Sequence, residues 1–356
     1  MNRREFLSVA ALGAVTMGTT IINFGCRSES SERIEPELPL EPINKEVIAE
    51  VWGQSYMSIG DIDDRIMAGT YCFPGSVAQI HCEGYGIVDT VDVGESVIDI
   101  EPDHGYVYLA CEYEWIYRDI IRLDPTKYNF QPYKQLKRGT HAGAFGVKRL
   151  LGELVFIGGG EIYTDGYGTS KEWDKEYFVK FGFQCQDTAF VAGYSYEDQS
   201  AGWFRSKNCY GWDWENVGPK YSRFMAAAVT EDEQFIYLVG TNNYQDKHSH
   251  NAATLWQYEV ATDILIQLFN FSGYDYTSCI RISDTGKVYF ILTKGWRSQE
   301  PGAQLVYWDG RKPHPIAEFE EGEGRGLIIK DGYAYCASRK DLSGGKITKV
   351  YLEEEG

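Results

Sequence analysis

The feature that most constrains the fold of this chain is a hairpin pattern that recurs along most of its length. Each copy has a short run of alternating apolar residues, a turn rich in Asp and Gly, and a second run with Tyr, Val and Leu. Short turns between alternating runs are hairpin signals. The clearest copy spans 97–111 and turns at Asp103-His104-Gly105. The other copies span 57–70, 146–160, 177–193, 226–240, 280–293 and 326–338.

A second pair of strand-like runs follows most of these hairpins. Residues 255–260 and 264–268, for example, flank a turn at 261–263. Each repeat therefore offers four strands, and the repeats recur roughly every 35–55 residues, which is typical of propeller blades. The sequence predicts an all-β chain folded as a β-propeller of seven four-stranded blades. Long amphipathic helices are not evident after the N-terminal region.

The two ends of the repeat region complement each other. The last repeat has only three strand-like runs, of which 346–352 is the final one, and the run 46–52 has no partner of its own. Pairing of these two runs would complete the last blade and close the ring, which removes an unpaired edge strand. The alternative is that both runs are independent edge strands.

The extreme N-terminus carries a second signal. Two arginines, a Phe-Leu pair and an apolar stretch over 6–22 follow one another, and the stretch is too short and too rich in Gly, Thr and Ala for a good spanning helix. The pattern resembles the bacterial twin-arginine export signal, whose motif residues here are Arg3, Arg4, Phe6 and Leu7. This resemblance implies an exported protein, in the periplasm or at the cell surface. The alternative is an ordinary N-terminal helix packed on the domain.

The apolar stretch ends in Asn23-Phe24-Gly25-Cys26, which resembles a lipobox although Asn23 departs from the usual aliphatic residue. The resemblance implies a lipid on Cys26 and attachment to a membrane. Cleavage by ordinary signal peptidase and an uncleaved anchor are the alternatives. Residues 27–44 are rich in Ser, Glu and Pro and are expected to form a flexible tether. We therefore expect a signal peptide over 1–26, a tether over 27–44 and the propeller over 45–356.

Two repeats contain a more specific pattern. It resembles the Asp-box turn of sialidase-like propellers, in which a polar side chain caps the turn between the third and fourth strands and a Trp packs between blades. One copy has Asn208 in place of the aspartate and one extra residue before its glycine. The residues that carry the two copies are Ser206, Asn208, Gly211 and Trp214, and Asp165, Gly166 and Trp173. The resemblance supports the fold. The arginine cluster, Tyr–Glu pair and aspartic acid of a sialidase are not brought together by any motif.

The charge of the chain limits its partners. There are 34 Lys+Arg against 52 Asp+Glu, a formal net charge of −18. Such a surface repels phosphate backbones and anionic headgroups, so we expect no nucleic-acid partner. It suits solubility, cationic partners or bound metal ions.

A divalent metal ion is the one cofactor that a local pattern suggests. Asp246, His248 and His250 are spaced two residues apart, so a strand would present all three side chains on one side. A solvated loop is the alternative. The acidic turn Asp61-Ile62-Asp63-Asp64 is a second candidate, for calcium, with a solvated hairpin turn as its alternative.

Seven cysteines remain once Cys26 is set aside, and an odd number cannot all pair within one chain. Cys111, Cys279 and Cys336 lie in or beside apolar runs and are expected to be small buried residues. Cys72–Cys82 and Cys185–Cys209 are candidate bridges. No cysteine falls in a CxxC spacing, so a zinc or thioredoxin-like site has no support.

No catalytic motif stands out among these repeats. The sequence favours a non-catalytic binding or assembly module that is tethered to a membrane and takes a protein or carbohydrate ligand. The alternative is a carbohydrate-active hydrolase of sialidase-like fold, which would use acids at the mouth of the propeller. Carboxylates that converge with an arginine at the centre of the ring would favour the hydrolase, and function must be argued from that site.

Overall fold

The computed structural model describes the repeat region of the chain. It covers residues 44–352 apart from short internal segments, and no helix in the described part is long and apolar enough to cross a membrane. The segments outside the described residues are 63–64, 72–74, 83–85, 95, 113–119, 126–128, 135–143, 159–160, 165–167, 173–176, 196–200, 208–212, 219–221, 242–251, 295–301 and 341–342.

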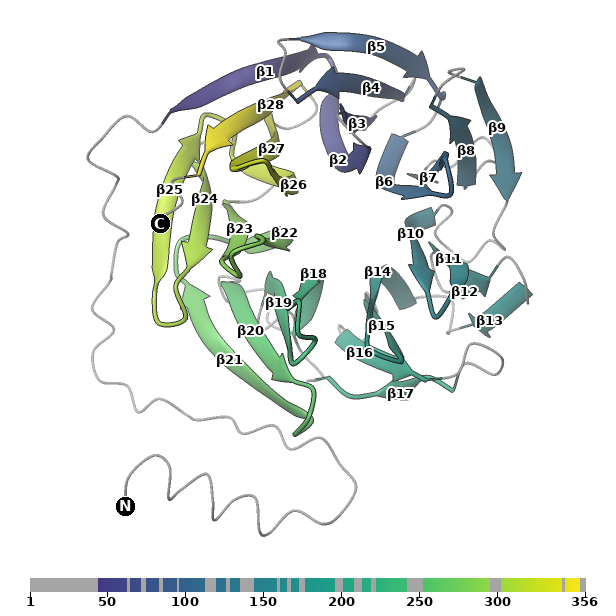
Figure 1. The fold of residues 1–356 in the computed structure, drawn as a ribbon, viewed down its shortest axis with the longest axis vertical. Coiled ribbons are helices and arrows are strands. Elements are labelled where there is room, and N and C mark those ends of the chain that lie inside the picture. Colours follow the sequence, from purple (N-terminus) through teal and green to yellow (C-terminus); the bar gives the residue numbers. More distant parts are fainter. Residues whose placement is uncertain are drawn as a thin grey trace.

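The described residues form a ring of seven four-stranded antiparallel sheets, which we call blades 1 to 7 (Figure 1). The predicted all-β propeller of seven four-stranded blades is confirmed. Blade 1 has β2 (Ser55–Ile62), β3 (Arg65–Tyr71), β4 (Ser76–His81) and β5 (Ile87–Asp92), and blade 2 has β6 (Ser96–Asp103), β7 (Tyr106–Glu112), β8 (Ile120–Asp124) and β9 (Asn129–Lys134). Blade 3 has β10 (Ala144–Leu150), β11 (Glu153–Gly158), β12 (Glu161–Thr164) and β13 (Gly168–Glu172), and blade 4 has β14 (Tyr177–Cys185), β15 (Thr188–Ser195), β16 (Ala201–Ser206) and β17 (Glu215–Asn216). Blade 5 has β18 (Arg223–Val229), β19 (Phe235–Thr241), β20 (Ala253–Glu259) and β21 (Ile264–Phe271), and blade 6 has β22 (Tyr276–Ile282), β23 (Val288–Thr293), β24 (Ala303–Trp308) and β25 (Pro313–Phe319).

Blade 7 combines strands from both ends of the described chain. It contains β26 (Glu323–Lys330), β27 (Tyr333–Lys340), β28 (Gly344–Tyr351) and, outermost, β1 (Lys45–Trp52). β1 runs antiparallel to β28, from Lys45 opposite Val350 to Trp52 opposite Gly344. In Figure 1 the purple β1 accordingly lies beside the yellow β28. The outer edge of β28 is thereby covered by a strand that lies almost 300 residues earlier in the sequence.

The seven predicted hairpins are the first two strands of the seven blades, nearest to the ring axis. Their turns have the backbone that the Asp- and Gly-rich sequences predict. His104-Gly105 and Asp331-Gly332 both have positive φ at two successive residues, which is the requirement of a type I′ turn. Leu151-Gly152 adopts the same backbone although leucine rarely does so.

The hydrophobic core lies between neighbouring blades. Between blades 4 and 5, the fully buried ring of Trp203 lies 5.1 Å from that of Phe190 and 4.6 Å from that of Tyr258. Aromatic side chains of the second and third strands thus fill the space between these two blades.

The cysteines of the described residues are free thiols. Cys111, Cys279 and Cys336 are buried, as predicted. The two candidate bridges are wrong, because Cys82 and Cys185 are also free. Cys185 donates its thiol to the backbone carbonyl of Glu233, 3.5 Å away in blade 5, so its sulfur faces the neighbouring blade. Cys82 is buried in the apolar cluster that joins blades 7 and 1.

Candidate functional site

Every innermost strand of the ring contains a β-bulge close to its start. The register with the second strand shifts between the second and fourth residues of β2 and β26, for instance, and within the first five residues of each of the others, with β22 shifting over two residues. A bulge inserts a residue that is unpaired and turns its side chain away from the regular alternation. We call the inserted residues the bulge ring: Met57, Ile98, Phe145, Lys180, Met225, Ser278 and Arg325.

The bulge ring gathers at one end of the ring axis, because all seven blades repeat the same strand order and their first strands begin at the same end. All of its members except Phe145 are half-buried, whereas the residues beside them are mostly buried. In blades 2 to 4, neighbouring members contact each other. Lys180 Nζ lies 3.7 Å from the centre of the Phe145 ring, and Ile98 packs against Phe145 and Tyr194.

Blade 7 brings two arginines and one carboxylate together at this end. Glu323 accepts hydrogen bonds from both guanidinium groups and from the hydroxyl of Tyr276, which begins β22 in blade 6. We call Tyr276, Glu323, Arg325 and Arg339 the glutamate cluster. The side chains of Glu323 and Arg339 are only 1% and 5% exposed. Both carboxylate oxygens are engaged by arginines, so neither is presented to a substrate.

Tyr276 of this cluster and the neighbouring Cys279 are potential nucleophiles, but burial keeps both protonated. Burial raises the pKa of the Tyr276 phenol well above its ordinary value, and the charge of Glu323 adds to that shift. Burial likewise raises the pKa of the Cys279 thiol to about 11. Desolvation disfavours the charged form of both groups, so both stay protonated near neutral pH.

Blades 3 to 5 contribute a second set of cations at the same end, which we call the cation–aromatic cluster: Phe145, Lys180, Tyr194 and Arg223. The guanidinium carbon of Arg223 lies 3.8 Å from the centre of the Tyr194 ring, and its Nη2 donates to the Tyr194 hydroxyl at 2.8 Å. Tyr194 and Phe145 are themselves buried. Stacking of cations on buried rings stabilises a positive charge at this end of an acidic protein.

The bulge ring is the feature that reading the sequence missed. The alternating pattern of each first strand predicts a regular strand, and a single inserted residue leaves that pattern almost unchanged. The one available signal is a charged residue that interrupts an apolar run, as Lys180 does in 177–185 and Arg325 does between two glycines.

Most of the residues singled out from the sequence lie outside the described residues. This applies to Arg3, Arg4, Phe6, Leu7 and Cys26, to His248, His250 and Asp246 between β19 and β20, and to Asn208, Gly211, Asp165, Gly166 and Trp173. Within the described part of the chain, no three or more His, Cys, Asp or Glu side chains gather as metal ligands would. Asp61 of the acidic turn pairs instead with Lys330 at 2.8 Å.

Two residues of the first Asp-box-like segment are described. Ser206 is buried at the end of β16, and Trp214 precedes β17, so the segment connects the third and fourth strands of blade 4. Trp214 packs against the apolar cluster between blades 3 and 4. The position of Trp214 agrees with a role in packing between blades.

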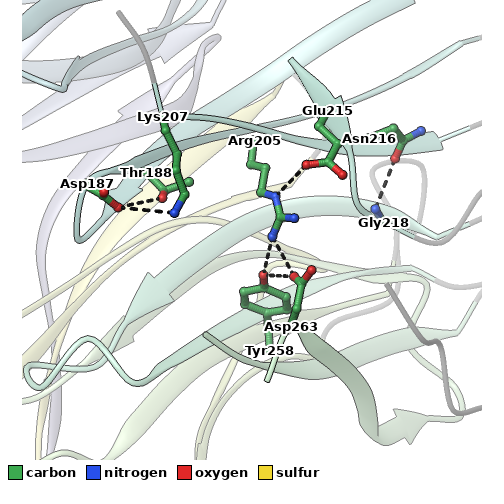
Figure 2. A network of polar contacts seen from close by, with 9 residues as sticks. All are labelled: Asp187, Thr188, Arg205, Lys207, Glu215, Asn216, Gly218, Tyr258 and Asp263. Carbon is green, nitrogen blue, oxygen red and sulfur yellow. Dashed lines mark hydrogen bonds and ion pairs between the residues drawn. The ribbon is translucent and has the colours of Figure 1, made fainter. Parts of the chain in front are cut away.

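A polar network lies beside this segment and joins blades 4 and 5 (Figure 2). Arg205 of β16 pairs with Glu215 at 3.1 Å and with Asp263 of the β20–β21 turn at 2.7 Å. Asp263 also accepts the hydroxyl of Tyr258, to which Arg205 donates at 3.2 Å. Burial raises the pKa of Tyr258 well above its ordinary value, and Asp263 adds to the shift. The network links side chains within and between blades, so its role is structural.

No protein-family model matches this sequence, and no curated protein resembles it in sequence. Solved structures resemble it in fold. The WD40 domain of Pan2 from Neurospora crassa has 9% identity and a TM-score of 0.57 over 87% of this chain and 98% of that one. A putative 6-phosphogluconolactonase from Bacteroides fragilis has 11% identity and a TM-score of 0.55 over 77% and 87%. The designed protein Ika8 has 10% identity and a TM-score of 0.53 over 86% and 100%. At such low identity these similarities establish the fold alone, and the chain is a seven-bladed β-propeller.

Proposed function

We propose that this chain is an exported, membrane-tethered β-propeller that acts as a non-catalytic binding or assembly module. Its ligand would be a protein or a carbohydrate rather than a nucleic acid, given the net charge of −18. The export signal at 3–7, the lipobox-like end at Cys26 and the tether over 27–44 support a location in the periplasm or at the cell surface. A ring of similar blades whose bulge-ring residues differ from blade to blade suits binding.

The observation that carries the non-catalytic role is the engagement of Glu323. General acid–base catalysis needs a carboxyl group within reach of the substrate's proton. Glu323 is 1% exposed and both its oxygens are held by arginines. The neighbouring Tyr276 and Cys279 are kept protonated by burial. The chemistry-bearing groups of the glutamate cluster therefore hold one another and are not poised to react.

A hydrolase is the second candidate, and one observation favours it. Tyr276 donates to Glu323 beside two arginines, which is the combination of residue types that the sialidase-like resemblance implies. The raised pKa of Tyr276 argues against that role. Incubation with fluorogenic glycosides of neutral and acidic sugars tests it. We expect no turnover. Turnover that disappears in Tyr276→Phe would replace the binding role with the hydrolase.

Binding itself is tested by retention on glycan and peptide arrays. The full chain, purified from membranes, should retain specific array members, and a chain that retains none contradicts a binding role.

Export is tested with Arg3→Lys and Arg4→Lys together. The exchanged protein should stay in the cytoplasm in cell fractionation, whereas Arg33→Lys in the tether, the matched control, should be exported. Unchanged export of the double variant would refute the twin-arginine interpretation.

The anchor is tested with Cys26→Ser, which should release the exported protein from membranes. Persistent membrane association of this variant would contradict attachment through a lipid on Cys26.

A further inference from the structure

The glutamate cluster contains more positive than negative charge. Arg325 and Arg339 share a single carboxylate, that of Glu323, and the third partner of this carboxylate is the neutral Tyr276 hydroxyl. The other buried carboxylate nearby, Glu321, pairs with Lys346 at 3.1 Å, and Lys346 also pairs with Glu320 at 2.6 Å. Within the glutamate cluster itself, the two arginines therefore have one carboxylate between them.

The hydrogen-bond donors of these arginines are also incompletely used. Arg325 Nε is buried and has no hydrogen-bond partner within the described part of the chain. Arg339 Nη1 donates to the thioether sulfur of Met57 at 3.0 Å, and thioethers are weak acceptors. Burying a cation or a donor without a good partner is costly, so a purely structural network of this kind should contain a second acceptor.

We propose that the glutamate cluster binds the oxyanion group of a small ligand, a carboxylate or a phosphate ester, through Arg325 and Arg339. This inference rests on the binding role proposed above. A guanidinium group presents several N–H donors in a planar fork that matches both kinds of oxyanion. The anion supplies a second negative charge in contact with the two arginines and accepts hydrogen bonds that the described residues leave unused.

The placement of Arg325 fits this role. It is the bulge-ring residue of β26, half-buried at the axis end of the ring, whereas its neighbours Glu323 and Gly324 are buried. Bulges frequently re-aim a side chain beside a functional site. The guanidinium carbon lies 5.8 Å from the centre of the Tyr276 ring, which limits the directions open to the side chain. The net charge of −18 repels anions at a distance. An anion is therefore held here only through direct contact with this pair of arginines.

The probes are three compounds with one sugar ring: glucuronate, glucose 6-phosphate and glucose. Each is titrated against the full chain, purified from membranes, and the melting temperature and Kd are measured at constant ionic strength. We expect glucuronate, glucose 6-phosphate or both to raise the melting temperature, and glucose not to. The probe that acts identifies the source of the oxyanion.

The informative variant is Arg325→Met, which removes the charge and keeps most of the side chain's volume. It should weaken anion binding about 10- to 100-fold, since hydrogen bonds to charged groups are among the strong ones. Its melting temperature without ligand should equal or exceed that of the unaltered protein, because Glu323 keeps Arg339 as a partner and one desolvated cation is gone. Arg325→Lys keeps the charge without the fork; it should fold and bind anions more weakly, and it replaces Arg325→Met if that variant does not fold.

Arg149→Met is the matched control. Arg149 pairs with Asp103 at the opposite end of the inner strands, so its loss should leave anion binding unchanged. If the unaltered protein, Arg325→Met and Arg149→Met all respond equally to the anion, the anion binds adventitiously and the inference is overturned. The inference is also overturned if no anion raises the melting temperature. A large fall in the ligand-free melting temperature of Arg325→Met with anion binding intact overturns it as well. Stabilisation by glucose alone overturns the anion site but leaves the binding role standing, whereas turnover of a glycoside overturns the binding role itself.

Discussion

The contact between blades 7 and 1 gives the sharpest test of how the ring is packed. Gly326 of β26 faces Ile59 of β2, and a Cβ atom at Gly326 would lie 2.4 Å from Ile59 Cγ2 and 3.1 Å from Ile59 Cβ. Unstrained carbon atoms prefer about 3.5–4.0 Å, so the two blades would have to separate by about 1 Å. Overpacking of this kind costs about 1–3 kcal/mol. Gly326→Ala should therefore lower the melting temperature by about 2–10 °C.

The same fold supplies a matched control at an equivalent position. Gly146 of β10, like Gly326, directly follows the bulge of its strand, but its Cβ would meet Lys180 O at 3.5 Å and Ile157 Cβ at 3.6 Å. These are ordinary contacts. Gly146→Ala should leave stability unchanged or raise it by about 0.4–1 kcal/mol, because alanine restricts the unfolded chain. The difference between the two variants isolates the steric effect from this shared gain.

The assays are thermal and urea denaturation of the chain without residues 1–26, both monitored by tryptophan fluorescence. The melting temperature, the urea midpoint and the slope are compared between variants. Ile59→Ala removes the clashing methyl group. Alone it should cost about 2–5 kcal/mol, and combined with Gly326→Ala it should cost less than the sum of the two by at least about 1 kcal/mol. If Gly326→Ala proves as stable as Gly146→Ala, or the double variant is simply additive, blades 7 and 1 do not pack in this way.

Three further predictions concern other parts of the ring. Arg205→Met should cost about 1 kcal/mol, because Arg205 links blades 4 and 5 through the partly exposed Asp263; a midpoint unchanged in low salt would contradict this. Backbone N–H groups, above all that of Lys312, hold the pKa of Asp309 well below its usual range, so this carboxylate stabilises the fold above about pH 4 and the effect is lost as pH falls through the lowered pKa. Asp309→Ala should accordingly lose stability at pH 7 and converge with the unaltered protein at low pH, and a deficit independent of pH would refute the assignment. The described buried thiols should not react with Ellman's reagent until the protein unfolds, since burial raises the pKa of Cys185, for example, to about 11. Rapid labelling of a folded chain that lacks Cys26, Cys72 and Cys209 would contradict the burial of these thiols.

The sequence repeats allowed the propeller architecture to be predicted from the sequence. Each hairpin brings together residues that are close in sequence, and turns such as Asp331-Gly332 need a backbone that glycine adopts readily. Local preference and tertiary structure agree there, so the seven blades and their first two strands were predictable. The buried Cys111, Cys279 and Cys336 followed from the same apolar alternation.

The two candidate disulfides are wrong because tertiary contacts, which the sequence does not indicate, surround these cysteines. The sequence offered Cys185–Cys209 as a candidate bridge, but the free Cys185 thiol donates to the backbone carbonyl of Glu233 in the next blade. Asp61, the described carboxylate of the acidic turn, pairs with Lys330 from the far end of the chain, whereas Asp63 and Asp64 lie outside the described residues. Contacts between blades join residues that no local pattern connects.

What the sequence by itself determined is the repeating β-hairpin and hence the ring of blades, because turn chemistry and alternation act over a few residues. Only the tertiary structure decided which side chains meet at the ring axis. A bulge of one residue turns Arg325 there, and strand pairing places Arg339 opposite Glu323. The first residue of β22, Tyr276, arrives from the neighbouring blade. The glutamate cluster forms because residues of blades 6 and 7 meet at the same end of the ring axis. No periodic pattern in the sequence indicates which residues meet there.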